Sequence, residues 1–108
     1  METALTRSKA KLLAKTYANV LQDGKFQFEE IYLFGSYAKN NFKKWSDVDI
    51  AVVSNRLKRN WEKNIILLRR FSRSVDERIE PLGFTSIDFK DKNNPLVSEI
   101  LKTGIKII

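Results

Sequence analysis

Two aspartates, Asp47 and Asp49, lie two residues apart directly before the apolar run Ile50–Val53. In an extended strand both carboxylates would project from one face, about 6.6 Å apart at roughly 3.3 Å per residue. Two like charges in this arrangement repel each other, whereas divalent cations bridge such pairs in phosphoryl-transfer sites. A surface ion cluster with Lys43 and Lys44 is the alternative explanation. The pair is therefore a candidate metal site.

A Gly-Ser dipeptide, Gly35-Ser36, ends an apolar segment over 30–34 and precedes the aspartate pair by ten residues. Glycine has no Cβ, so a ligand can approach its backbone, and a helix beginning here would direct free N–H groups towards an anion. The Ser36 hydroxyl and the Lys39 ammonium would add contacts to a polyphosphate. An ordinary strand turn, with Ser36 as a helix cap, is the alternative interpretation.

These side chains need a scaffold, and the hydrophobic periodicity predicts strands that alternate with helices. The signal Asp23-Gly24 ends the first helix, Asn60 caps the second, and Asn94-Pro95 starts the third. The predicted helices cover 5–21, 60–76 and 95–103, and the predicted strands cover 30–34, 47–53, 78–82 and 105–108. This alternation indicates an α/β fold, and because no linker or repeat divides the chain, we expect a single domain over 1–108.

The composition excludes several classes of chemistry. The 108 residues contain no His and no Cys, which removes disulfides, cysteine-ligated zinc, thiol catalysis and the commonest general base. Catalysis would have to use carboxylates, hydroxyls, lysines or the backbone. No apolar run reaches the length of a membrane span, and lysines occur where a secretory signal would be apolar, so we expect a cytoplasmic protein.

Positive charge is concentrated in one segment. The formal net charge is +7, and Arg56–Arg78 holds eight Lys or Arg against three Asp or Glu. Such an excess is compatible with a phosphate-bearing partner. A nucleic-acid-binding stripe is one interpretation, but a solvated helix face is the commoner cause of this pattern. Nucleic acid is therefore not the partner that we favour.

Taken together, Gly35, Ser36, Asp47 and Asp49 resemble the signature of the minimal nucleotidyltransferases of the DNA polymerase beta superfamily. Other residues that follow the family pattern are Phe34, Lys39, Ser46 and Ile50–Val53. The resemblance implies a nucleotidyltransferase fold, with a small mixed β-sheet flanked by α-helices. It also implies that Gly35-Ser36 seats a triphosphate, and that Asp47 and Asp49 hold Mg²⁺ or Mn²⁺.

The same resemblance implies a third carboxylate on the following strand, which would act as metal ligand and catalytic group with Asp47 and Asp49. Glu80, in Arg-Ile-Glu-Pro after the second predicted helix, fits this strand position. Asp88 is the other candidate, but it lies three residues after Thr85 and matches a capping box at the start of a short helix. We therefore expect Glu80 to be the third carboxylate.

The function implied by the resemblance is the transfer of a nucleoside monophosphate, AMP from ATP, onto a hydroxyl of an external acceptor, with pyrophosphate leaving. Small members of this family commonly pair with a helical HEPN-domain protein as toxin and antitoxin, and some attach AMP to a tyrosine of that partner. A nucleoside triphosphate and a HEPN-domain protein are thus the expected partners. A nucleotide-binding antitoxin that neutralises its partner by contact alone is one alternative, and a nucleic-acid binder is another.

Overall fold

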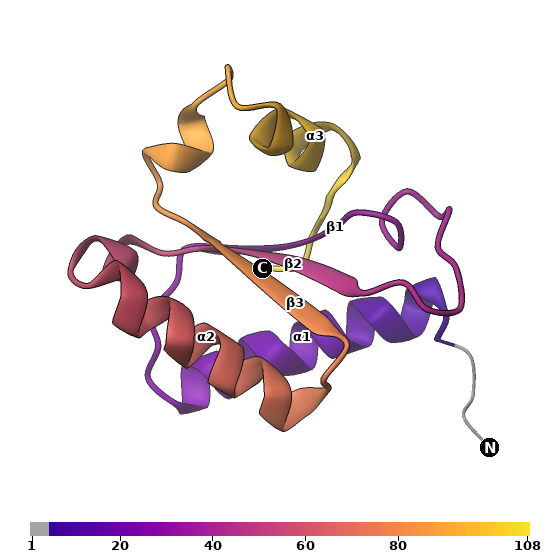
Figure 1. The fold of residues 1–108 in the computed structure, drawn as a ribbon, viewed down its shortest axis with the longest axis horizontal. Coiled ribbons are helices and arrows are strands. Elements are labelled where there is room, and N and C mark those ends of the chain that lie inside the picture. Colours follow the sequence, from indigo (N-terminus) through magenta and orange to yellow (C-terminus); the bar gives the residue numbers. More distant parts are fainter. Residues whose placement is uncertain (1–4) are drawn as a thin grey trace.

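The computed structural model describes residues 5–108, which form a four-stranded mixed sheet with helices on both faces (Figure 1). The elements follow one another as α1 (Arg7–Asp23), β1 (Glu30–Phe34), β2 (Val48–Val53), the 3-10 helix η1 (Asn55–Lys58), α2 (Trp61–Val75), β3 (Ile79–Phe84), the 3-10 helix η2 (Asp88–Lys90), α3 (Pro95–Thr103) and β4 (Ile105–Lys106). The predicted α/β class with a small mixed sheet is confirmed.

The strand order is β3-β2-β1-β4, so β1 and β2 occupy the centre of the sheet. β1 pairs antiparallel with both β2 and β4, whereas β2 and β3 are parallel. The connection between the parallel strands contains α2, because parallel neighbours need a crossover. As a result, the C-terminal end of β1 and the N-terminal ends of β2 and β3 meet at one end of the sheet.

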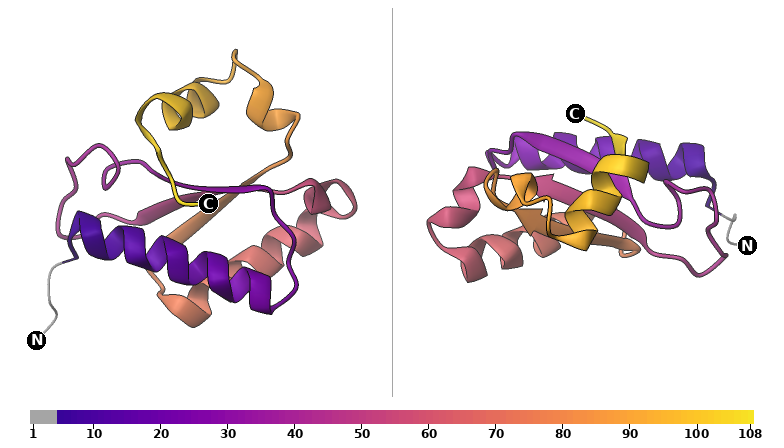
Figure 2. Two further views of the ribbon diagram at one scale, coloured as in Figure 1. Left: turned by 180° about the vertical axis from the view of Figure 1, so that it is seen from behind. Right: turned by 90° about the horizontal axis from the view of Figure 1, so that it is seen from above.

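Each face of the sheet is covered by its own helices. α1 and α2 lie side by side against one face, and α3 lies over the other (Figures 1 and 2). Leu33 and Ile50 belong to the core on the α1 and α2 side, whereas Phe34 and Ala51 belong to the core beneath α3. Successive strand residues point to opposite faces, so Asp49 lies on the α3 face of the sheet.

The helix starts predicted from capping residues are confirmed. The Asn60 side chain accepts a hydrogen bond of 3.2 Å from the Lys63 backbone N–H, and α2 begins at the next residue. Asn94 caps α3 through the Leu96 N–H at 3.0 Å, with Pro95 at the first helical position. None of the helices within residues 5–108 combines the length and the apolar character that crossing a membrane requires.

β3 extends further than the sequence predicts. The expected strand covers 78–82, but the observed strand continues past Pro81 and Gly83 to Phe84. Pro81 is tolerated because β3 is an edge strand, with no neighbour on its outer side to accept an N–H. A Cβ on Gly83 would lie 2.8 Å from Leu57 Cδ1, so glycine permits η1 to pack closely here. Every boundary lies within two residues of the predicted one, and β4 ends early, at Lys106.

Candidate active site

The strand register brings separate parts of the predicted site together. Phe34 lies opposite Asp49 in the pairing of β1 with β2, and Asp49 lies opposite Glu80 in the pairing of β2 with β3. Paired residues of neighbouring strands point to the same face of a sheet, so Asp49 and Glu80 share the α3 face. Glu80 is exposed and Asp49 is half-buried. Asp47 is also exposed and immediately precedes β2.

The backbone of Gly35 lies against the side chain of Asp49. Gly35 has a φ of 76°, in the left-handed region that glycine adopts without strain. A Cβ at this position would overlap Asp49 Oδ2 and lie 3.2 Å from Asp49 Cγ. Any other residue at position 35 would therefore have to displace the carboxylate, which accounts for a glycine beside Asp49.

Residues 35–40 form a turn rather than the start of a helix. The Lys39 N–H donates to Gly35 O at 3.1 Å, and the Asn41 N–H donates to Ser36 O at 3.0 Å. Asn40 has a left-handed φ of 60°, which prevents the turn from continuing as a helix. No helix begins here, so the expectation that a helix start would direct N–H groups towards an anion is wrong, and so is the interpretation of Ser36 as a helix cap. The seating of a triphosphate by the Gly35-Ser36 turn stays a prediction.

The turn is anchored to the core by its middle residues. Tyr37 is almost completely buried and stacks on Phe42, with 4.4 Å between the ring centroids. Ala38 is buried too, and its carbonyl accepts a hydrogen bond of 2.9 Å from Arg7 Nη2 at the start of α1. Packing on both sides therefore holds the Gly35-Ser36 backbone in place beside the sheet.

Several carboxylates influence one another at this end of the sheet. The pKa of Asp49 is raised to about 6, above all because the side chain is partly buried. The negative charges of Asp47, Glu80 and Glu99 raise it further, and the ammonium of Lys39 lowers it. Ionised Asp49 thus lies in surroundings that disfavour negative charge, and a bound cation would relieve this cost.

Lys39, predicted to contact phosphate, forms an ion pair with Glu99 of α3. The distance between Lys39 Nζ and Glu99 Oε1 is 2.7 Å, and both side chains are partly exposed. Glu99 lies 60 residues further along the chain. The sequence analysis missed Glu99 because no motif or spacing distinguishes it from other helical glutamates. A phosphate beside Gly35-Ser36 would compete with Glu99 for the lysine.

The residues at this end provide oxygen ligands, which suit hard divalent cations such as Mg²⁺ and Mn²⁺. Within residues 5–108, no group of three or more His, Cys, Asp or Glu side chains could hold a metal ion by itself. Mg²⁺ is commonly bound by one or two carboxylates together with substrate phosphates and water. The residues present therefore fit a cation that is shared with a phosphate ligand, and the ligand set Asp47, Asp49 and Glu80 stays a prediction.

Asp88 has the capping role that its spacing from Thr85 predicts. The Thr85 N–H donates to Asp88 Oδ2, and the Asp88 N–H donates to Thr85 Oγ1, each at 3.1 Å. This reciprocal pair has the pattern of a capping box, and it closes the turn over 85–88 that leads into η2. Asp88 is thus engaged elsewhere, whereas Glu80 is in register with Asp49. The role of Glu80 as third carboxylate remains a prediction.

The lysines before the aspartate pair do not neutralise it. None of the ion pairs among residues 5–108 joins Lys43 or Lys44 to Asp47 or Asp49. The Lys43 backbone N–H instead donates to Ser46 Oγ at 2.8 Å and shapes the turn that leads into β2. A surface ion cluster therefore does not account for the two aspartates.

Comparison with known proteins identifies relatives of the chain. The profile of the family described as polymerase beta, nucleotidyltransferase, matches residues 15–108. The chain is 35% identical over 107 residues to MJ1305 of Methanocaldococcus jannaschii, which is assigned as a protein adenylyltransferase; the match covers 91% of this chain and 72% of MJ1305.

Two solved structures share the fold. One, from Sulfolobus solfataricus, is assigned as a nucleotidyltransferase; it has a TM-score of 0.63 at 18% identity, covering 98% of this chain and 89% of that one. The other is a toxin-antitoxin structure with AMP-PNP, with a TM-score of 0.59 at 21% identity, covering 87% of this chain and 72% of that one. On the family match and the identity to MJ1305, the chain belongs to the polymerase beta nucleotidyltransferase family and is a nucleotidyltransferase.

Proposed function

We propose that this nucleotidyltransferase moves AMP from ATP, with Mg²⁺ or Mn²⁺, onto a hydroxyl of a separate HEPN-domain protein, for which it acts as antitoxin. The observation that carries the proposal is the register that puts Asp49 between the Gly35 backbone and Glu80. The assignment of MJ1305 as a protein adenylyltransferase supports AMP as the group and protein as the acceptor. The fold shared with a toxin-antitoxin structure containing AMP-PNP supports the antitoxin role.

In this proposal the turn at Gly35-Ser36 binds the triphosphate, and Asp47 and Asp49 hold the cation together with phosphate oxygens. A bound divalent cation would neutralise charge on the phosphate that is transferred. Lys39 would exchange its ion pair with Glu99 for a phosphate oxygen, because both partners are partly exposed and free to separate. The nucleotide would thus lie at the end of the sheet, beside the α3 face.

In this proposal Glu80 accepts the proton of the acceptor hydroxyl. The acceptor oxygen forms a bond to the α-phosphorus, the bond between that phosphorus and the leaving pyrophosphate breaks, and the hydroxyl proton passes to the Glu80 carboxylate. Glu80 is exposed on an edge strand, so an external protein can reach it. Asp49, which pairs with Glu80 across the two strands, would face the nucleotide and its cation.

The test is a transfer assay with ATP labelled on its α-phosphate, Mg²⁺ and a co-encoded helical partner protein. We expect the partner to become labelled. Glu80→Gln should lower the transfer rate by at least about a hundredfold while ATP still binds, because only a positioned proton acceptor is lost. The matched control is Asp88→Asn, which should transfer nearly normally because asparagine can still accept the Thr85 N–H.

Two results would contradict the proposal in different ways. Inactivation by Asp88→Asn, with normal transfer by Glu80→Gln, would show that the third carboxylate is wrongly assigned. Tight binding and neutralisation of the partner by the wild type, without any label transfer, would show that the chain is an antitoxin by contact alone.

A further inference from the structure

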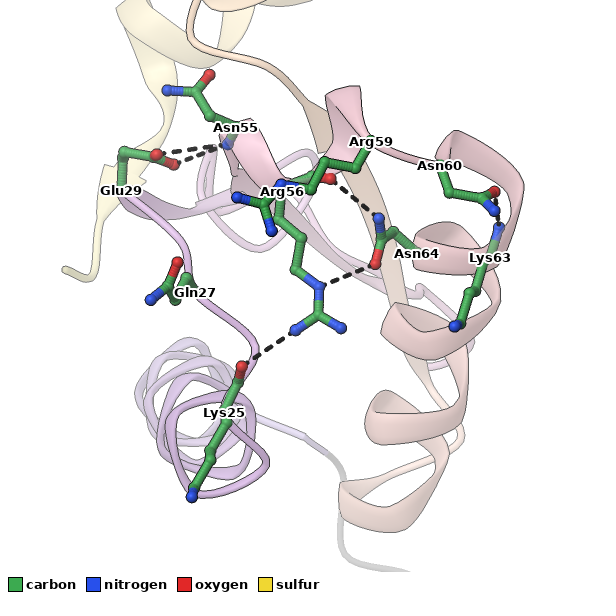
Figure 3. Close-up of a pocket in the computed structure, with 9 residues that line it drawn as sticks. All are labelled: Lys25, Gln27, Glu29, Asn55, Arg56, Arg59, Asn60, Lys63 and Asn64. Carbon is green, nitrogen blue, oxygen red and sulfur yellow. Dashed lines mark hydrogen bonds between the residues drawn. The ribbon is translucent and has the colours of Figure 1, made fainter.

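Figure 3 shows the residues that line a polar hollow of about 580 Å³. The hollow lies at the opposite end of the sheet from the candidate active site. Its lining comes from the segment between α1 and β1, from η1 and the residues that follow it, and from the start of α2. Asn55, in this lining, follows the C-terminal end of β2 at Val53, whereas Asp49 is near its N-terminal end. Asp49 and Val53 are about 13 Å apart along the strand, at roughly 3.3 Å per residue. The hollow is thus a separate site.

Positive charge predominates in the hollow. Its lining includes Lys25, Arg56, Arg59 and Lys63 against the single carboxylate of Glu29. None of the ion pairs within residues 5–108 includes any of these four cations. Glu29 instead accepts the Asn55 N–H, at 3.1 Å to Oε2. Four cations around one hollow repel one another, and an anion bound among them would remove this repulsion.

Arg56 is fixed at the centre of the group. Its Nε donates to Asn64 Oδ1 and its Nη1 donates to the Lys25 carbonyl, each at 3.0 Å. Asn64 is buried and returns a bond of 3.0 Å from Nδ2 to the Arg56 carbonyl (Figure 3). The guanidinium carbon lies 4.7 Å from the centre of the Phe26 ring. Because these contacts hold the guanidinium in advance, binding through its Nη2 would cost little conformational entropy.

The chemistry of the lining indicates phosphate rather than a nucleobase. Guanidinium and ammonium groups bind phosphate oxygens through charge-assisted hydrogen bonds. Bases are commonly held by stacking on exposed aromatic rings, but no aromatic residue lines the hollow. The neighbouring Phe26 is buried and covered by Arg56. The volume lies in the range of about 300–1,000 Å³ that is usual for sites of compact ligands.

We propose that this hollow binds a compact anion carrying two or more phosphate groups, independently of the candidate active site. Arg56 contributes a fixed guanidinium, and Arg59 and Lys63 contribute exposed cations at the rim of the hollow. The anion is either a free oligophosphate or the phosphate chain of a nucleotide. Arg59 and Lys63 are the residues to change, because no side-chain hydrogen bond or ion pair within residues 5–108 depends on them.

The test is a calorimetric titration of the wild-type protein with tripolyphosphate in the presence of a metal chelator, which disables any metal-dependent nucleotide site. We expect binding, and we expect Arg59→Gln with Lys63→Gln to weaken it by at least about tenfold, since two charge-assisted contacts are lost. The matched control, Lys15→Gln with Lys102→Gln, removes the same charge from exposed positions outside the lining. It should alter the affinity by less than about twofold.

Nuclear magnetic resonance locates the ligand directly. Tripolyphosphate should shift the side-chain signals of Arg56 Nε–H and Asn64 Nδ2, and leave the amide of Asp49 in place. A titration with metal-free ATP tests the source of the phosphates. If the Arg59→Gln, Lys63→Gln double variant loses as much affinity for ATP as for tripolyphosphate, a nucleotide ligand is supported. Wild-type affinity in the double variant, or shifts centred on Gly35 and Asp49, would overturn the proposal. The proposal would also be overturned if single-stranded RNA bound through Arg59 and Lys63 while tripolyphosphate did not bind.

Discussion

The substitution Asp49→Asn is expected to stabilise the metal-free protein near neutral pH, and the gain is expected to vanish in acid. The pKa of Asp49 is raised from 3.8 to about 6 in the folded chain, first by burial and then by neighbouring carboxylates. A carboxyl group with a raised pKa costs stability when it is ionised. The cost is complete above the folded pKa of about 6 and declines as the pH falls towards 3.8, because the folded state then binds the proton more tightly than the unfolded one.

The size of the effect follows from the same two values. Each pH unit between the folded and unfolded pKa corresponds to about 1.4 kcal/mol, so the upper bound for Asp49 is roughly 3 kcal/mol. Asp49 is only half-buried, and solvent screens its neighbours, so we expect about 1 kcal/mol in practice. For a domain of this size, that corresponds to a rise in Tm of roughly 5 °C.

The measurement is a set of thermal melts in chelator, for wild type and variant, from about pH 7.5 to pH 4. Asp47→Asn, at an exposed position, should give a smaller gain of the same sign. Glu77→Gln, which removes an exposed carboxylate outside the group acting on Asp49, is the control and should change little. A variant Asp49→Asn that is less stable than wild type at neutral pH would refute the reasoning. An equal gain at both ends of the pH range would refute it too, since the effect would not arise from charge.

Three further predictions concern ligand binding and packing. Mg²⁺ with ATP should raise the Tm, because a hundredfold excess of ligand over its Kd adds about 2.7 kcal/mol of stability. The metal-dependent part of the rise in Tm should be lost in the double variant Asp47→Asn with Asp49→Asn. A full rise in that variant would exclude these aspartates as ligands. Gly35→Ala should lower stability by about 1–3 kcal/mol in denaturant titrations, because alanine is strained at a φ of 76° and its Cβ overlaps the carboxylate. Tyr17→Phe should cost about 1 kcal/mol in the same titrations, since the buried hydroxyl donates to Leu68 O at 2.8 Å; an unchanged midpoint would show that this bond adds nothing.

Much of the fold could be predicted because the signals are local. Asn60 and Asn94 cap helices at the predicted positions, because a side chain next to the first turn satisfies its N–H groups wherever the helix lies in the fold. The capping box of Thr85 and Asp88 is equally local, since both partners belong to one turn. The end of β3 was predicted two residues early, at Leu82, because Pro81 and Gly83 together are typical of a strand end. Both are tolerated in an edge strand, and only the sheet order shows that β3 is one.

The sequence by itself determined which residues are available for chemistry, namely a Gly-Ser turn, two aspartates at strand spacing and a glutamate after the second helix, with His and Cys excluded. It did so because residue type and short-range spacing are properties of the chain alone. Only the tertiary structure decided that Asp49 lies between Gly35 and Glu80, that Glu99 holds Lys39, and that basic residues from the segment after α1, from η1 and its end, and from α2 surround one hollow. These relations depend on strand register and helix packing, which arise from side chains that meet across long stretches of sequence.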